Sequence, residues 1–236
     1  MKSGFAAAAA ARWRTLHETT VVASFIRENG EECARRFLAY DAVELRRVAR
    51  AYKQSCVKLG YEPMSEEEAT LVEREYFSVL EEFGKDFKNP YGWARPFLSN
   101  NSSGKKRLRF SDLEAAVDFS SMRFDYGQAS NEVHASARSL FAHLGLVEEN
   151  TLLAGPSIHG MADPGSNTAR SLTFLNLTCV QVFPVLDALV SSYVTMLLGD
   201  EVRSLLVGIE HKLSSEAECQ RPVKTGHVGS NQNRPF

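Results

Sequence analysis

The sequence predicts an all-α fold, an up-and-down bundle of five or six long helices. Apolar residues recur at spacings of three and four in five segments, and no segment alternates with the period of two that strands require. The 8 prolines and 15 glycines cluster between these segments. With 236 residues, 44% of them hydrophobic, the chain can bury one full core. We expect one helical domain over residues 1–213 and a flexible C-terminal tail over 214–236.

Two helices are expected before the first chain break, at residues 5–27 and 31–59. The first starts in a run of alanine, the best helix former, and Gly30 is the stop signal that separates the two. The second contains an apolar seam at alternating spacings of four and three, which predicts near-parallel packing against a neighbouring helix. The seam consists of Leu38, Ala42, Leu45, Ala49, Tyr52, Cys56 and Leu59.

A third helix over residues 65–84 and a long loop over 85–110 come next. Ser65 and Glu68 have the spacing of a capping box, which marks the start of a helix. The loop contains two prolines and a Tyr-Gly-Trp cluster that ends at Trp93. Trp93 is placed to cover a pocket, although a tryptophan in a loop more often covers the core.

The centre of the expected bundle is one long helix over residues 111–145. Its apolar face consists of Leu113, Val117, Phe124, Val133, Ala137, Leu140 and Leu144. At 100° per residue, a second set falls within a narrow sector beside that face: Arg123, Gly127, Ser130, His134 and Phe141. A polar row that borders a core seam is where a bundle can build a pocket, so the predicted site depends on His134.

Two more helices are expected, at residues 166–198 and 201–213. The first is the most hydrophobic segment of the chain. Four residues within it favour a buried core helix over a membrane span: Asn176, Gln181, Pro184 and Asp187. Pro184 should also kink it. These seams offer more apolar surface than a small bundle easily buries, so we expect a homodimer and no membrane association.

Composition excludes several classes of protein. The net charge of −2 and the pI of about 6.3 do not support RNA binding, although a local basic patch leaves it open. The cysteines form no CxxC pair and no zinc-spaced cluster, and we interpret them as reduced thiols of a cytoplasmic protein: Cys33, Cys56, Cys179 and Cys219. The N-terminus lacks a leucine-rich signal core. Because nucleotide-binding, zinc-protease and serine-hydrolase motifs are missing from the sequence, we expect no cofactor and no metal.

Four segments resemble, in order, those of the bacterial family of unknown function DUF5677. They read RTLHETTVVASFI, ECARRFLAYDAVE, FGKDFKNPYGWA and FDYGQASNEVHAS, and the later ADPGSNTARSL also looks like that family. The resemblance covers roughly residues 12–200. It implies a helical fold without an assigned activity and a polar set that would bind a ligand: Arg14, Glu18, Arg36, Tyr40, Trp93, Tyr126, Ser130 and His134.

The first functional hypothesis is a non-catalytic bundle that binds an anionic ligand or a partner protein. Arg14, Arg36 and His134 would hold the anionic group, and Glu18 and Tyr40 would orient them. The same side chains also suit a buried polar network that only fixes the register of the helices. Under either reading, we expect Arg14 with Glu18, Arg36 with Tyr40, and Ser130 with His134 to converge on one pocket.

The alternative is a metal-independent ribonuclease that resembles the HEPN proteins of toxin–antitoxin and phage-defence systems. In such proteins an arginine is followed, after four to six intervening residues, by a histidine. The histidine moves protons at the 2′-hydroxyl while the arginine holds the phosphate. Arg138 and His143 have this spacing, and with His134 they are the catalytic candidates. Three arginine–histidine pairs match by spacing, about the number expected by chance.

Overall fold

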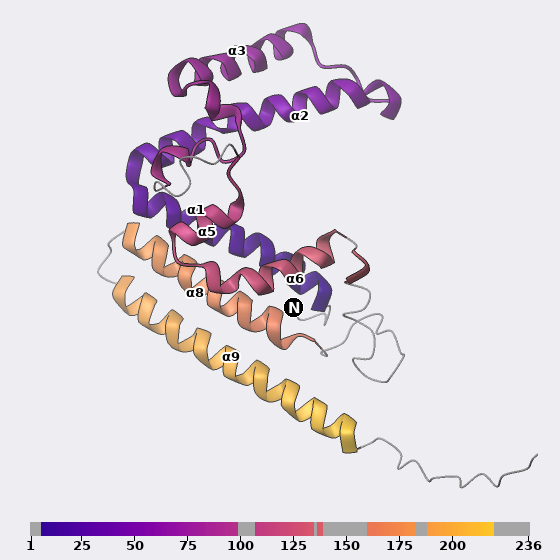
Figure 1. Cartoon of the computed structure of the whole chain (residues 1–236). Coiled ribbons are helices and arrows are strands. Elements are labelled where there is room, and N and C mark those ends of the chain that lie inside the picture. Colours follow the sequence, from indigo (N-terminus) through magenta and orange to yellow (C-terminus); the bar gives the residue numbers. More distant parts are fainter. Residues whose placement is uncertain (1–5, 99–106, 135, 139–159, 183–187, 220–236) are drawn as a thin grey trace, which may run out of the picture.

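The computed structural model describes residues 6–98, 107–134, 136–138, 160–182 and 188–219, and throughout these ranges the regular elements are helices without a strand (Figure 1). The all-α prediction is therefore confirmed. Within the same ranges, no helix has both the length and the apolar character needed to cross a membrane.

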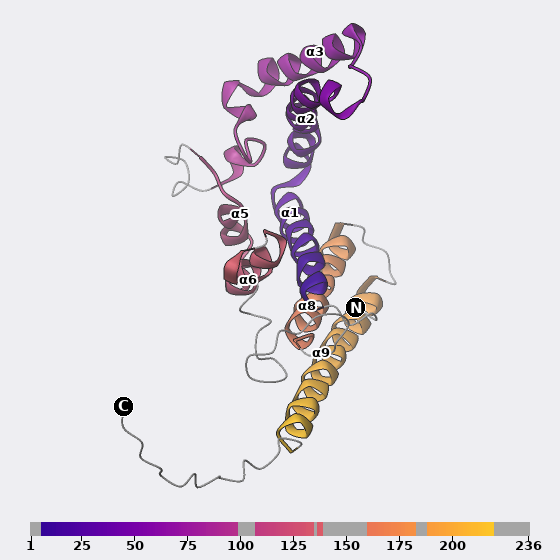
Figure 2. The ribbon, with the colours of Figure 1, turned by 90° about the vertical axis from the view of Figure 1, so that its right-hand side faces the viewer.

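Helix α1 (Ala6–Ala39) is the element on which the fold is assembled. Helices α8 (Ala162–Val182), α6 (Arg123–Val133) and α5 (Phe110–Ala116) all pack along it (Figures 1 and 2). Its buried side chains recur mostly every three or four residues: Ala9, Trp13, His17, Thr20, Val21, Ser24, Phe25 and Cys33. This periodicity places them on one side of the helix, toward the core.

The boundary expected at Gly30 is confirmed as a sharp kink that separates two helical stretches of α1. Gly30 has φ 75°, a left-handed conformation that glycine adopts without strain, and α1 continues beyond it to Ala39. A second, milder interruption lies at Tyr40, whose backbone stays in the right-handed helical region (φ −66°, ψ −19°), and α2 (Asp41–Ser55) begins directly after it. The expected helix over 31–59 is thus divided between α1 and α2.

Helix α2 and helix α3 (Glu66–Phe83) form a hairpin that stands away from α8 and α9 (Figures 1 and 2). The predicted capping box is confirmed: the Ser65 hydroxyl accepts from the Glu68 N–H, and the Glu68 carboxylate accepts from the Ser65 N–H. The seam predicted for residues 31–59 is mostly not buried, because among the described residues α2 packs mainly against α3; within α2, Leu45 is 39% exposed.

The loop before α5 is more ordered than its composition suggests. It contains the short 3₁₀ helices Lys85–Lys88 and Arg95–Phe97. Phe87 and Trp93 from this segment are buried in the main core, at 1% and 3% exposure. Trp93 therefore does cover the core.

The single central helix predicted over residues 111–145 is wrong. Helix α5 ends at Ala116, a 3₁₀ turn (Ser120–Met122) follows, and α6 begins only at Arg123. Asp118 has φ 58°, and a left-handed residue cannot continue a right-handed helix. The break changes which side of the second half faces the core, so that Phe124, expected on the apolar face, is 74% exposed. The end of the predicted helix, with Leu140, Phe141 and Leu144, lies outside the described residues.

The apolar segment predicted as one helix over 166–198 forms two, α8 and α9 (Ala188–Cys219). Helix α9 packs against the side of α8 that faces away from α1, and it runs past the end expected at Leu213 (Figures 1 and 2). The two helices approach closely where Gly199 meets Thr173, since a Cβ at Gly199 would lie 2.5 Å from the Thr173 hydroxyl oxygen. Pro184 lies outside the described residues.

Candidate functional site

The predicted polar residues form two clusters along α1, and the first joins Arg14, Glu18 and Tyr126. Arg14 donates to the Tyr126 hydroxyl (2.8 Å) and lies 3.0 Å from the Glu18 carboxylate, to which Tyr126 donates at 2.5 Å. Burial of the phenol raises the pKa of Tyr126 to about 12, together with the Glu18 carboxylate that accepts a hydrogen bond from the phenol. Tyr126 is therefore a neutral donor at physiological pH. Ser130 donates to the Tyr126 carbonyl oxygen one turn earlier in α6.

The second cluster lies near the end of α1 and joins Arg36, Tyr40 and Trp93. Arg36 donates through Nε to the Trp93 carbonyl oxygen (3.2 Å), and the Tyr40 hydroxyl donates to the Asn89 carbonyl oxygen (2.8 Å). Arg47 in turn donates to the Tyr40 hydroxyl at 3.1 Å. These bonds fix the segment around Trp93 against α1 and α2. Arg36 and Tyr40 thus hold a loop in place.

The turn that carries Tyr91 and Trp93 has an unusual backbone. Tyr91 has φ 56°, a conformation that non-glycine residues rarely adopt, and it costs on the order of 1–3 kcal/mol. Gly92 approaches the preceding 3₁₀ helix so closely that a Cβ would lie 2.2 Å from the Phe87 carbonyl oxygen. The turn brings the Trp93 ring edge-on to Phe25, at 5.6 Å between ring centroids.

An open hollow of about 620 Å³ connects the two clusters, and we call it the aromatic hollow. Glu18 comes from the first cluster, and Tyr40 and Trp93 come from the second. The complete lining is Glu18, Val22, Phe37, Leu38, Tyr40, Asp41, Glu44, Tyr91, Trp93 and Phe110. Five of these side chains are aromatic, three are carboxylates, and this set of described residues contains no lysine or arginine.

The other predicted site residues lie outside this lining: Arg14, Arg36, Tyr126, Ser130 and His134. His134 is exposed in the turn that ends α6, where its N–H bonds to the Ser130 carbonyl oxygen (3.1 Å). Arg138 is also exposed, and His143 lies outside the described residues. The structure therefore unites part of the predicted set and leaves His134 at the surface.

The buried histidine of this structure is His17, which we did not select from the sequence. Its side chain is fully buried, and Nε2 lies 3.0 Å from the Glu114 carboxylate, which also accepts from Arg123 at 2.8 Å. Its Nδ1 atom is buried without a hydrogen-bond partner among the described residues. The signal was available, because His17 falls four residues after Trp13 and four before Val21 on the buried side of α1. This network connects α1, α5 and α6.

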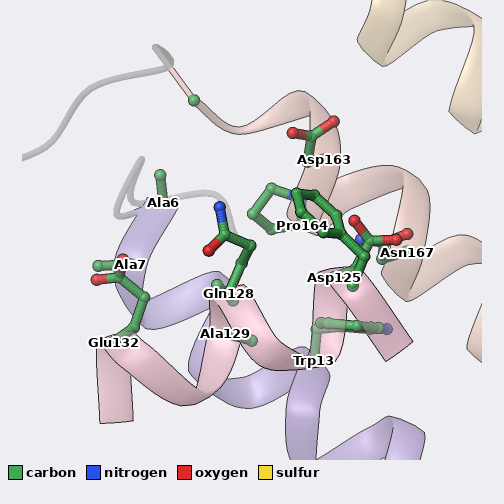
Figure 3. A pocket seen from close by; sticks show the side chains of 13 residues that line it. Ala6, Ala7, Trp13, Asp125, Gln128, Ala129, Glu132, Asp163, Pro164 and Asn167 are labelled. Atoms are coloured by element: carbon green, nitrogen blue, oxygen red, sulfur yellow. The ribbon is translucent and has the colours of Figure 1, made fainter. Parts of the chain in front are cut away.

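A second, smaller hollow of about 300 Å³ lies between the start of α1, α6 and the start of α8 (Figure 3). Asp125 and Asn167 lie close together at one side of it, while Gln128 and Glu132 extend from α6. The pKa of Asp125 is raised chiefly by burial and, to a lesser extent, by the nearby Asp163 carboxylate. No group of three or more potential metal ligands occurs in the described part of the chain, here or elsewhere.

Residues 1–151 match a family described as "Family of unknown function (DUF5677)". The chain belongs to the DUF5677 family. The match includes both polar clusters and the aromatic hollow of this DUF5677 protein, and it ends before α8 and α9, which include the ADPGSNTARSL segment. No curated protein and no solved structure matches the chain.

Proposed function

We propose that this DUF5677 protein is a non-catalytic binding protein and that the aromatic hollow receives a segment of a partner protein. The observation that supports this proposal is that Glu18, Tyr40 and Trp93, from three separate parts of the sequence, line one open hollow. Leu38 at its edge is 72% exposed, an apolar surface that a docked chain would cover.

A partner protein suits this hollow better than the anionic ligand that the sequence also suggested. Arg14 is already bound to Glu18 and Tyr126, and Arg36 is bound to the Trp93 carbonyl oxygen. The charged side chains of the lining are carboxylates, which repel an anion. Both arginines therefore stabilise the segments that line the hollow, and their charges are not available to a ligand.

The ribonuclease alternative has less support from the described residues. His134 and Arg138 are exposed and line neither of the two hollows described above, and His143 lies outside the described residues. Cleavage of RNA by the purified protein, lost in His134→Ala, would favour this alternative over the binding function.

A selection of displayed random peptides on the full chain tests the binding function. Leu38→Trp fills the hollow from its exposed edge, and Leu59→Trp is the matched control, because Leu59 is 63% exposed and outside the lining. We expect enriched peptides that bind the wild type and Leu59→Trp equally and bind Leu38→Trp about tenfold or more weakly, a difference of about 1.4 kcal/mol. Equal binding to all three proteins, or no enrichment, would contradict the proposal.

We also infer that two copies associate through the outer surface of α9. Eight large apolar side chains of α9 are 44–64% exposed: Tyr193, Val194, Met196, Leu197, Leu198, Val202, Leu205 and Val207. A stable interface buries about 800 Å² on each partner, and eight half-exposed side chains of this size supply much of that area. Sedimentation should show a dimer at micromolar concentration and a monomer for Leu198→Asp. A monomeric wild type would contradict this assembly.

A further inference from the structure

We infer that the partner segment places an arginine side chain in the aromatic hollow. This inference rests on the proposed binding function and specifies its chemistry. Two properties of the lining support it, the sign of its charge and the state of its aromatic rings.

The carboxylates of the hollow give it a net negative charge. Glu18 is neutralised by Arg14, whereas Asp41 and Glu44 are exposed and have no ion pair among the described residues. Both lie in the first turn of α2, where the helix dipole stabilises a carboxylate. Both carboxylates are therefore available to a cation that enters the hollow.

The aromatic rings supply the second half of a cation site. This chain already stacks arginines on aromatic rings: Arg14 on Tyr126 at 5.0 Å and Arg46 on Tyr76 at 3.8 Å. Trp93 is 3% exposed and its ring packs against Phe25 and Phe37, so its faces are not open to a ligand. Within the hollow, Phe37, which is 38% exposed, and the half-buried Tyr91 have no such cation over them among the described residues. A guanidinium between these rings and the α2 carboxylates would gain both cation–π and charge–charge attraction.

Arginine fits this lining better than lysine. Its planar guanidinium can stack on a phenyl or phenol ring while its N–H groups, which lie in the guanidinium plane, point at a carboxylate beside the ring. It is also more weakly hydrated than an ammonium group, so less hydration is lost when it enters a half-buried aromatic site. The exposed Leu38 would contact an apolar neighbour of that arginine.

Fluorine NMR tests the inference directly, because the chain has only two tryptophans, Trp13 and Trp93. Protein labelled with 5-fluorotryptophan gives one signal for each, assigned with Trp93→Phe. The probe is acetyl-Gly-Arg-Leu-Gly-amide, and the controls replace its arginine with citrulline, which is isosteric but uncharged, or with glutamate. We expect the arginine probe to shift the Trp93 signal saturably in the millimolar range. Trp13, which lines the second hollow, should not move.

A charge-matched pair of variants locates the effect. Asp41→Asn with Glu44→Gln should weaken the arginine probe at least fivefold, whereas Glu66→Gln with Glu67→Gln, in the first turn of α3, should not. An equal shift with citrulline, or no shift of Trp93 with arginine, would overturn the inference. If displayed peptides still require an open hollow in that case, the binding function stands with a different ligand; if none are enriched, both fail.

Discussion

The two ends of the molecule, the core around α1 and the hairpin of α2 and α3, each contain a glutamate bound to basic side chains. The glutamate of the core is buried, and that of the hairpin is partly exposed. In the core, the Glu114 side chain is 1% exposed and binds both His17 and Arg123. In the hairpin, the Glu73 side chain is 41% exposed and accepts three hydrogen bonds from two nitrogens of Arg46. A buried carboxylate has no water to replace a lost partner, whereas an exposed one does. We therefore expect the two carboxylates to contribute unequally to stability, although each lies 2.8 Å from an arginine nitrogen.

The largest expected effect is the loss of the buried carboxylate. Glu114→Ala leaves the fully buried His17 without its partner and opens a cavity between α1 and α5, so we expect a loss of about 3–5 kcal/mol in the free energy of unfolding. Glu73→Ala is the matched change in the hairpin, and we expect it to cost less than about 1 kcal/mol. Urea denaturation measures both. Similar losses in the two variants would break the comparison.

A second expectation concerns the motion of the two ends. Helix α2 has one buried residue, Val43, whereas α1 has a continuous buried side. We therefore expect the hairpin to open without global unfolding. Amide hydrogen exchange over residues 44–55 should be at least about a hundredfold faster than over residues 13–25, since each tenfold corresponds to about 1.4 kcal/mol of opening free energy. Equal protection would show that the hairpin and the core unfold together.

The contrast between the ends also explains what the sequence could predict. The all-α class and the Ser65 capping box follow from spacings of three or four residues, which are local. The pairing of Arg14 with Glu18 is local in the same way. The division of the central helix was missed because it depends on the left-handed backbone of Asp118, a conformation that the apolar pattern around it does not encode.

The candidate site was predictable only in part for the same reason. His17 and Glu114 are 97 residues apart in the sequence, and nothing in the spacing of either residue indicates that they meet. Tyr126 was proposed from the family resemblance, and its bond to Glu18 spans 108 residues. Tyr40 and Trp93 line the same hollow because of a turn whose shape depends on the close contact at Gly92. Such contacts arise from packing.

The buried phenols of the core should make stability depend on alkaline pH. The folded pKa of Tyr126, about 12, is above the ordinary value of 10, so its contribution is fully present below pH 10 and is lost as the pH rises through 12. The pKa values of Tyr40 and Tyr91 are raised too, chiefly by burial. Tyr126→Phe should therefore make the fall in unfolding free energy between pH 10 and 12 shallower by up to about 1.4 kcal/mol per pH unit.

The control for this pH profile is Tyr61→Phe, because Tyr61 is 59% exposed at the far end of the hairpin turn. It should leave the alkaline slope unchanged. An unchanged slope for Tyr126→Phe as well would show that the phenol of Tyr126 is not what binds the extra proton in the folded state.

The smallest expected effect lies in the exposed hairpin, where local bonds are not reinforced by burial. The Ser65 hydroxyl accepts one of the unpaired N–H groups at the start of α3, so Ser65→Ala should destabilise α3 by about 1 kcal/mol. Ser78 is exposed in the middle of α3 and provides a matched substitution with the opposite effect on helix stability, because alanine is the better helix former there. Ser78→Ala should stabilise α3 by a few tenths of a kcal/mol. Both changes are read from amide exchange of α3. If the hairpin opens on its own, they should alter exchange in α3 while exchange in α1 stays constant; a parallel change in α1 would mean that the two ends are coupled.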